Sequence, residues 1–125
     1  MDSDIDTFAD RYATVWNEPD PELRRKRIAE LWAEDAVECT PTSEYRGHVE
    51  LEPRVTAAYE QFVAGGQHVF TYPGGAVAHH GAVLFPTHMV PPGGGDPAWT
   101  GTVFVLLGED GRITRDYQFT DPSPA

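Results

Sequence analysis

Asp116 is the side chain of this sequence that is best placed to carry a proton. It lies within residues 112–120, a run with the β-branched and aromatic side chains that are typical of a strand. Because side chains alternate along a strand, Asp116 shares one face with Gln118. A carboxylate enclosed by apolar side chains has a raised pKa and can serve as a general acid or base. The alternative is an Asp116 that is solvated, or that pairs with Arg112 or Arg54.

Tyr12 is the second candidate for chemistry. It belongs to a set of apolar residues at helical spacing, which are Ile5, Phe8, Tyr12, Val15 and Trp16. From the apolar face of such a helix, its phenol could donate a hydrogen bond to a carbonyl or enolate oxygen. The alternative is a core tyrosine whose hydroxyl is bonded within the protein, because buried tyrosines usually find a partner. Trp16, on the same face, is expected to form a pocket wall or part of the core.

The histidines do not follow a metal-binding pattern. The sequence has five, which are His48, His68, His79, His80 and His88. His79 and His80 are adjacent near a predicted turn, and adjacent strand residues point to opposite faces, which is poor chelate geometry. No spacing of His, Cys and carboxylate residues matches a known metal site, so we expect no bound metal. Cys39 has no base near it in sequence and is expected to be an inert core residue.

Elements in the first half of the chain must position these residues. Apolar side chains at helical spacing, and the breaks between them, predict helices over residues 5–16, 21–32 and 48–62 and a short strand over residues 36–40. Asp20 and Pro21 suit the N-cap and the first position of the second helix. Gly65 and Gly66 end the third helix, because glycine accepts the left-handed conformation found at helix C-termini. The basic run at residues 24–27 is expected to be a solvated helix face.

The second half of the chain predicts strands and turns. The strand candidates are residues 67–72, residues 76–90 with a turn at 79–81, residues 99–107 and residues 112–120. The Asp110-Gly111 pair between the last two predicts a hairpin. Helices followed by strands, without alternation, predict the α+β class, in which one curved sheet buries its apolar face beneath the helices. A curved sheet covered by helices forms a pocket, where function should be sought.

Composition limits the partners of the chain. Its 125 residues suffice for one domain over residues 1–125, and 40% apolar and 23% charged residues are ordinary for a globular protein. The net charge of -11 repels phosphates, so neither nucleic acid nor an anionic membrane is an expected partner. The single cysteine excludes an intramolecular disulfide and fits a reducing compartment. The acidic first residues lack the features of a signal peptide, and no apolar run could span a bilayer, so we expect a cytoplasmic protein.

The whole layout resembles the nuclear transport factor 2-like superfamily, and within it the SnoaL-like, polyketide cyclase-like branch. The resemblance covers residues 8–121, and its carriers are fold markers: Tyr12, Trp16-Asn17, Asp20, residues 31–37, Tyr45-Arg46-Gly47, Gly101 and residues 110–113. It implies a cone-shaped α+β barrel, in which a curved, mostly antiparallel sheet is closed by three N-terminal helices. It also implies a pocket between the first helix and the concave sheet face, into which Asp116 points, and dimerisation through the convex face.

The superfamily hosts several chemistries, and two of them lack their residues in this chain. The ketosteroid isomerases place an aspartate base before the proline that ends the first strand, where this chain has Thr40 before Pro41. A hydroxyl cannot replace that base near neutral pH. These isomerases pair a helix tyrosine, matched by Tyr12, with a protonated aspartic acid, whose position here is Val103. Limonene-type epoxide hydrolases need Arg-x-Asp on the penultimate strand, and residues 102–107 carry no charge.

The concave face predicts an apolar pocket. Alternation along the strands, together with the first helix and the last strand, gives the residues expected to contact a ligand: Trp16, Val83, Phe85, Thr87, Met89, Val103, Val105 and Gln118. They are mostly apolar and suit a polyketide- or terpenoid-like small molecule, although plain core packing is the alternative for any one of them. On the opposite face, Phe104, Leu106, Tyr117 and Phe119 form a patch that the helices cannot cover, which predicts a homodimer through the convex face.

These observations favour a small enzyme that needs no cofactor and acts by general acid–base proton transfer, as a cyclase, an isomerase or a dehydratase. Asp116 is the expected acid or base, Tyr12 the oxyanion donor, and Glu38 the second candidate base. No glycine loop that could bind a phosphate opens a helix, since the glycines at 93–95 lie in a hairpin. The alternative is a non-catalytic ligand-binding or dimerisation module. An open pocket with two or more converging polar groups would favour the enzyme.

Overall fold

Helices precede most of the strands in the computed structural model, which describes residues 2–122. The helices are α1 (Asp2–Val15), α2 (Pro21–Leu31) and α3 (Gly47–Ala58), and α3 continues as a π-helical turn, η1 (Tyr59–Val63). Asp20 caps α2 as predicted, because its carboxylate accepts a hydrogen bond from the backbone N–H of Glu22 at 3.0 Å. None of these described helices is both long enough and apolar enough to cross a membrane.

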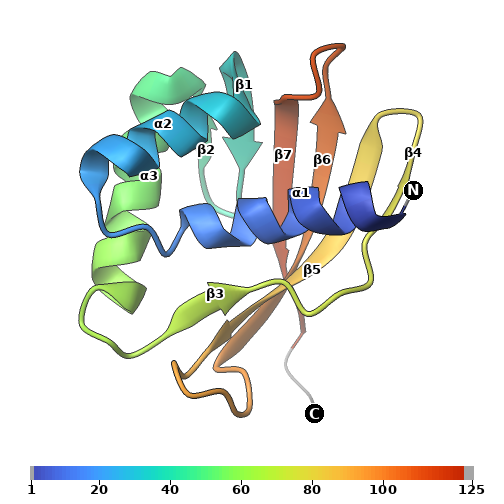
Figure 1. The fold of residues 1–125 in the computed structure, drawn as a ribbon. Helices are drawn as coiled ribbons and strands as arrows, with labels where there is room; N and C mark the ends of the chain where they lie inside the picture. The colour runs from blue at the N-terminus through green and yellow to red at the C-terminus, as the bar shows by residue number, and fades with distance from the viewer. Residues whose placement is uncertain (1, 123–125) are drawn as a thin grey trace.

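Seven strands form one curved sheet (Figure 1). They are β1 (Trp32–Cys39), β2 (Glu44–Arg46), β3 (Val69–Thr71), β4 (Val77–His79), β5 (Ala82–Val90), β6 (Trp99–Leu107) and β7 (Ile113–Thr120). Their order is β2-β1-β7-β6-β5-β3, and β4 also pairs with β5. Among these described strands every pairing is antiparallel except that of β1 with β7. The predicted α+β fold is therefore confirmed, with a sheet that is curved but remains open at its edges.

The core lies between the sheet and the helices. Figure 1 shows α1 crossing in front of the sheet, with α2 and α3 to one side of it. The largest fully buried side chains include Trp32, Tyr12, Phe85, Ile28 and Leu51. The ring of Tyr12 packs against those of Trp32 and Phe85, with centroid distances of 5.3 and 5.2 Å. These aromatic contacts hold α1 on the concave face and place Tyr12 inside the fold.

The first strand begins earlier than predicted. Trp32, expected at the end of the second helix, is the first residue of β1, because α2 passes directly into the strand. Its N–H still bonds to the carbonyl of Ile28 while its own backbone is extended. Residues 34 and 35 are both exposed and lie where the β1–β7 pairing is irregular. They interrupt the alternation of buried and exposed residues from which a strand is predicted. Residues 44–46, which lie outside the predicted helices and strands, form the short edge strand β2.

Arg24 is buried, which corrects the prediction that residues 24–27 form a solvated face. Its Nε and Nη2 donate to the carbonyl oxygen of Glu18 at 3.0 and 2.8 Å, and Nη1 donates to Oγ1 of Thr56 at 3.0 Å. The guanidinium also lies 4.7 Å from the centre of the Tyr59 ring. The partners of this guanidinium are a backbone carbonyl and a hydroxyl group rather than a carboxylate. The sequence therefore contains no acidic partner that could have indicated a buried Arg24.

Candidate functional site

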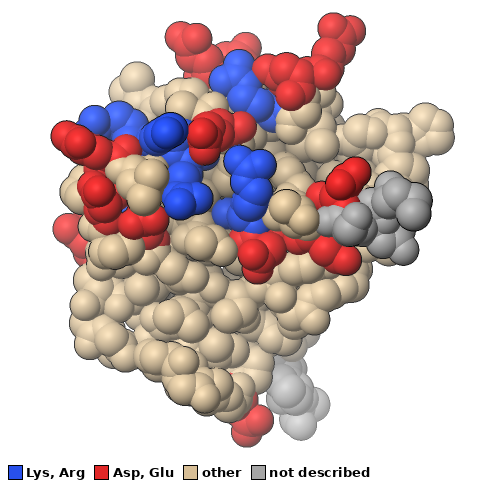
Figure 2. Space-filling model, viewed as in Figure 1, with Lys and Arg blue, Asp and Glu red and all other residues tan. Residues whose placement is uncertain are grey.

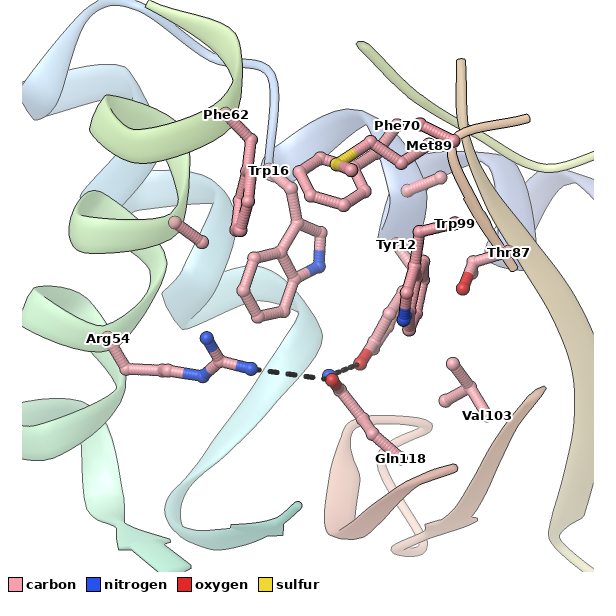
Figure 3. A pocket seen from close by; sticks show the side chains of 13 residues that line it. Tyr12, Trp16, Arg54, Phe62, Phe70, Thr87, Met89, Trp99, Val103 and Gln118 are labelled. Atoms are coloured by element: carbon pink, nitrogen blue, oxygen red, sulfur yellow. Dashed lines mark hydrogen bonds between the residues drawn. The ribbon is translucent and has the colours of Figure 1, made fainter. Parts of the chain in front are cut away.

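An apolar pocket of about 320 Å³ lies between the helices and the sheet (Figure 3). It is lined by Tyr12, Ala13, Trp16, Arg54, Ala58, Phe62, Phe70, Thr87, Met89, Ala98, Trp99, Val103 and Gln118. Figure 3 shows aromatic rings around one end of it, and Tyr12, Arg54 and Gln118 converging at the other. An apolar cavity with a few convergent polar groups is the usual form of a small-molecule site.

Asn17 holds one wall of this pocket in place. Asn17 comes just after the end of α1, and its side chain makes two hydrogen bonds with the backbone of Phe70 on β3. Nδ2 donates to the carbonyl oxygen at 2.7 Å, and Oδ1 accepts from the N–H at 2.8 Å. The Phe70 ring thereby lies 6.2 Å from the ring of Trp16 and 6.3 Å from that of Phe62, centre to centre. In the sequence Asn17 is only a fold marker, because a lone amide after a helix does not reveal its partner.

Gly101 leaves the space that Trp99 occupies. Both residues lie on β6, two positions apart, and therefore on the same face of the sheet. A Cβ atom at position 101 would lie 2.3 Å from Cη2 of the Trp99 indole and 2.9 Å from the carbonyl oxygen of Phe119. Glycine therefore lets the indole fold back over its own strand. There it forms part of the pocket wall beside Met89, its cross-strand neighbour.

Tyr12 connects the pocket to a buried carboxyl group. Its hydroxyl donates a hydrogen bond to Oδ2 of Asp116 at 2.7 Å, and Nε1 of Trp32 donates to the same oxygen at 3.2 Å. Asp116 has no exposed surface, in agreement with the face that alternation along β7 predicts. Its other oxygen, Oδ1, is buried without a hydrogen-bond partner among the described residues. Asp116 does not line the pocket, which corrects the expectation that it points into the pocket, so Tyr12 is its link to a bound molecule.

Glu38 is a second buried carboxyl group beside the first. It is in register with Asp116 on the parallel neighbouring strand, and it has no exposed surface. Nε of Arg54 donates to Oε1 of Glu38 at 3.3 Å, and Nε2 of Gln118 donates to Oε2. Nε2 of Gln118 also donates to the Tyr12 hydroxyl at 2.7 Å. One hydrogen-bonded network therefore joins the polar end of the pocket to two buried carboxyl groups.

Burial governs the protonation of this network. Desolvation raises the pKa of Asp116 well above its usual range; the charge of Glu38 adds to the rise, and the hydrogen bonds from Tyr12 and Trp32 offset part of it. Burial also raises the pKa of Glu38, and the Arg54 guanidinium acts against this rise. The pKa of Tyr12 is raised well above its usual value by burial and then by the two carboxyl groups. The phenol is therefore neutral, and Asp116, which no cation contacts, holds a proton more readily than an exposed aspartate does.

The residues predicted to contact a ligand divide into two groups. Five of them line the pocket: Trp16, Thr87, Met89, Val103 and Gln118. Val83, Phe85 and Val105 do not line it and pack in the core instead, which corrects the prediction. The reason is that α1 covers this part of the sheet, where the rings of Phe8 and Tyr12 lie 6.1 and 5.2 Å from that of Phe85. Alternation gives the face on which a residue lies, but not which part of that face a helix covers.

Seven wall residues were not assigned to the pocket from the sequence: the alanines 13, 58 and 98, and four larger residues, Arg54, Phe62, Phe70 and Trp99. Two of them had a usable signal. Phe62 continues the apolar face of the third helix, and Trp99 shares the alternation of Val103. Phe70 and Arg54 reach the pocket through contacts with distant segments, which periodicity does not show.

The histidines and the cysteine lie apart from this network. Within residues 2–122, no three His, Cys, Asp or Glu side chains are grouped so that they could hold a metal ion. His79 and His80 are exposed at the turn between β4 and β5. Nε2 of His48 lies 2.8 Å from the carbonyl oxygen of Trp32, and Cys39 is half-buried at the end of β1.

No model of a known protein family and no curated protein matches the sequence. Solved structures do match it. A candidate isomerase of the SnoaL-like family from Agrobacterium tumefaciens is 29% identical with a TM-score of 0.81, over 93% of this chain and 96% of that one. A candidate polyketide cyclase from Sinorhizobium meliloti is 18% identical with a TM-score of 0.67, over 94% of this chain and 98% of that one.

Other matches have the same fold without an assigned activity. A SnoaL-like protein of unknown function from Burkholderia thailandensis is 12% identical with a TM-score of 0.66, over 93% of this chain and 97% of that one. A designed protein with the nuclear transport factor 2 fold matches with a TM-score of 0.72, so the fold by itself does not specify a reaction. From the fold and these matches together, this chain has the nuclear transport factor 2-like fold, and at 29% identity it is similar to a member of the SnoaL-like branch.

Proposed function

We propose that this chain is a small enzyme that transfers a proton to or from an apolar, polyketide- or terpenoid-like molecule bound in the pocket. The reaction would be a cyclisation, an isomerisation or a dehydration, in which Tyr12 contacts a ligand oxygen and Asp116 exchanges a proton with Tyr12. One observation carries the proposal. Tyr12 lies on the wall of an apolar pocket and is hydrogen-bonded, at 2.7 Å, to a fully buried carboxyl group. The candidate isomerase and the candidate polyketide cyclase among the matches agree with chemistry of this kind.

The hydrogen bond between Tyr12 and Asp116 reverses when Asp116 takes up a proton. A phenol offers one donor and two acceptor positions. With Asp116 ionised, Tyr12 donates to it. With Asp116 protonated, the carboxyl group donates to the phenol, and the phenolic hydrogen is then free to point at the ligand. Gln118 donates to the phenol oxygen in both states and holds it in position.

The proton transfer balances over three groups. Tyr12 gives its proton to a carbonyl or enolate oxygen of the ligand, while the carboxyl proton of Asp116 passes to the phenol oxygen. The ligand oxygen ends protonated, Tyr12 is neutral again, and Asp116 carries the negative charge. Because the pKa of Asp116 is raised, its acid form persists to a higher pH than that of an exposed aspartate. The reverse movement returns the proton to Asp116.

A ketone that exchanges its α-protons tests this proposal without knowledge of the natural substrate. In this exchange Tyr12 donates to the ketone oxygen while solvent D2O accepts the α-proton, and the enol then takes up deuterium at carbon as the oxygen proton returns to the protein. We would follow the loss of the α-proton NMR signals of 2-tetralone in D2O, with and without the protein. Asp116→Asn keeps the shape of the side chain and removes its titration, so it should reduce protein-catalysed exchange by ~10²–10⁴-fold. Asp10→Asn makes the same change at an exposed position of α1 and should leave the rate unchanged. Equal rates for the wild type and Asp116→Asn would favour the non-catalytic binding module.

We also propose that the chain forms a homodimer through the convex face of the sheet. In-register apolar residues form a row across four strands, with Val77 on β4, Leu84 on β5, Phe104 on β6 and Tyr117 on β7. The rings of Phe104 and Tyr117 lie 6.2 Å apart. Leu84, Val77 and the neighbouring Phe119 expose 41%, 59% and 54% of their surfaces. A contiguous exposed patch of this kind favours association with a second copy.

A further inference from the structure

We infer that the ligand of this pocket carries an ionised oxygen, such as a carboxylate or an enolate, on a planar apolar body, and that Arg54 binds that oxygen. The inference rests on the proposed function, since it names the ligand class of the same pocket. Of the thirteen described residues that line the pocket, Arg54 is the only one with a charged side chain. Neither of the two buried carboxyl groups lies on its wall. On the wall itself, a molecule in the pocket therefore contacts one cation, which is ion-paired with Glu38 behind the wall, and no anion.

Arg54 is held so that part of its guanidinium remains available. Nε donates to Glu38 at 3.3 Å, and Nη2 lies 3.5 Å from Oε1 of Gln118. Nη1 has no hydrogen-bond partner among residues 2–122. The guanidinium also lies 5.1 Å from the centre of the Trp16 ring and 5.2 Å from that of Tyr45. An arginine fixed by an ion pair and two rings is preorganised to bind an oxygen with its remaining donors.

Tyr12 is the second group at this end of the pocket that can present a hydrogen to a ligand, since both amide hydrogens of Gln118 are bonded to Tyr12 and Glu38. Gln118 directs its amide oxygen at Arg54 and its amide nitrogen at Tyr12. When Asp116 is protonated, the Tyr12 hydroxyl is free to donate as well. Figure 3 shows Arg54 and Tyr12 on the two sides of Gln118. Two donors around one position suit an oxygen that carries negative charge, because hydrogen bonds to charged groups are the stronger ones.

The surface near the pocket carries few charged residues, although the chain has a net charge of -11. Between residues 61 and 108, Asp96 is the only Asp, Glu, Lys or Arg of the sequence. This stretch includes β3, the β5–β6 loop and the wall residues Phe62, Phe70 and Trp99. Figure 2 shows charged side chains gathered over the upper part of this face and almost none over the lower part. An anionic ligand therefore has a nearly neutral surface to cross before it reaches Arg54.

Two matched ligands test the inference directly. The compounds 2-naphthoate and 2-naphthamide share one ring system and nearly one shape, but only the first is charged at neutral pH. Isothermal titration calorimetry of the wild type should show that 2-naphthoate binds about tenfold more tightly, because its oxygens form charge-assisted hydrogen bonds with Arg54.

Variants of Arg54 test whether its guanidinium causes the tighter binding of 2-naphthoate. Arg54→Gln should bind both compounds equally and should bind 2-naphthamide as the wild type does, which also shows that the pocket is intact. Arg54→Lys keeps the charge without the planar fork and should retain part of the preference. Arg25→Gln is the matched control, because Arg25 pairs with Glu52 outside the pocket and should leave the full preference in place.

Each outcome has one meaning. The inference is overturned if the wild type binds 2-naphthoate no more tightly than 2-naphthamide, or if the preference survives in Arg54→Gln; the proposed proton transfer stands in both cases. Binding of neither compound to the folded wild type overturns the inference together with the proposed ligand site. The proposed function fails on its own if Asp116→Asn retains full exchange activity while the preference for 2-naphthoate is intact.

Discussion

Glu38 and Asp116 lie in register on the parallel strands β1 and β7, and neither carboxyl group has exposed surface. Two buried carboxyl groups that are neighbours do not both ionise readily, because each charge raises the cost of the other. Arg54 forms its ion pair with Glu38, which leaves Asp116 with neutral partners only, Tyr12 and Trp32. The two groups therefore titrate as a coupled pair, in which Asp116 is the member that favours the protonated form.

The stability of the wild type should fall, relative to Asp116→Asn, as the pH rises. An aspartate in an unfolded chain has a pKa of about 3.9, whereas burial raises the pKa of Asp116 in the fold, so the native state binds a proton that the unfolded state has lost. The stabilisation is complete below the unfolded pKa and disappears as the pH passes the folded pKa. Urea unfolding between about pH 4 and about pH 9 should show this loss in the wild type and not in the variant.

The control for this experiment is Asp10→Asn, which should follow the wild type at every pH because Asp10 is exposed. Glu38→Gln should change the pH dependence in the same direction as Asp116→Asn, since the pKa of Glu38 is also raised by burial. A constant difference between the wild type and Asp116→Asn across the pH range would contradict the raised pKa.

Tyr12→Phe should slow the exchange of 2-tetralone α-protons by ~10²-fold or more, close to the effect of Asp116→Asn. Asp116 does not line the pocket, so removal of the phenol should disconnect it from the ligand. The double variant should then be no slower than the slower single variant, since the two groups act as one unit. Tyr59→Phe, at a ring that contacts Arg24, is the control. Full activity in Tyr12→Phe would rule out transfer through the phenol.

The long, regular elements of this fold could be predicted, because a sustained spacing of apolar residues indicates either a helix or a strand and rarely both. β5 and β6 have the predicted bounds, and alternation along β7 placed Asp116 on the inner face. β1 lacks the alternation of buried and exposed residues that is typical of a strand, because Ala36, Val37 and Glu38 are buried in succession. Without alternation, the sequence could not decide whether the Glu38 side chain points into the fold or toward solvent. Glu38 was therefore only the second candidate base.

Contacts between distant segments were beyond the reach of sequence patterns. The amide of Asn17 and the backbone of Phe70 are bonded across more than fifty positions of sequence, and neither residue type identifies the other. The place of Trp99 in the pocket depends on the absence of a Cβ at Gly101, which only the folded strand reveals. Such details decide the shape of the pocket, whereas the periodicity decides only that a pocket forms.

Gly101→Ala should destabilise the fold and change the pocket. The new Cβ would overlap the Trp99 indole, at 2.3 Å, and approach the carbonyl oxygen of Phe119, at 2.9 Å. Crowding of this kind typically costs about 1–3 kcal/mol, and the displaced indole should weaken the binding of 2-naphthamide. Chemical unfolding and calorimetry would measure the two effects. Gly93→Ala is the control, because a Cβ there meets nothing within 4 Å; wild-type behaviour of both variants would show that Trp99 relocates without cost.

Light scattering at micromolar concentration should give the mass of a homodimer. Leu84→Lys should shift the population toward the monomer, because it places a charge in the middle of the apolar row on the convex face. Val49→Lys is the control, since Val49 on α3 is 88% exposed and lies outside that row. A monomeric wild type would contradict the proposed assembly.

Gln118 sets the direction in which a ligand can bind. Its amide oxygen faces Arg54, and its amide nitrogen faces Glu38 and Tyr12. A half-turn of the amide would place a nitrogen against the guanidinium and an oxygen against the carboxyl group of Glu38, so its neighbours permit one orientation. With the amide fixed in this way, the hydrogens left for a ligand at the inner end of the pocket belong to Arg54 and, when Asp116 is protonated, to Tyr12. A molecule with one apolar end and one oxygen-bearing end should enter with its oxygen first, and the opposite orientation would leave these donors unsatisfied.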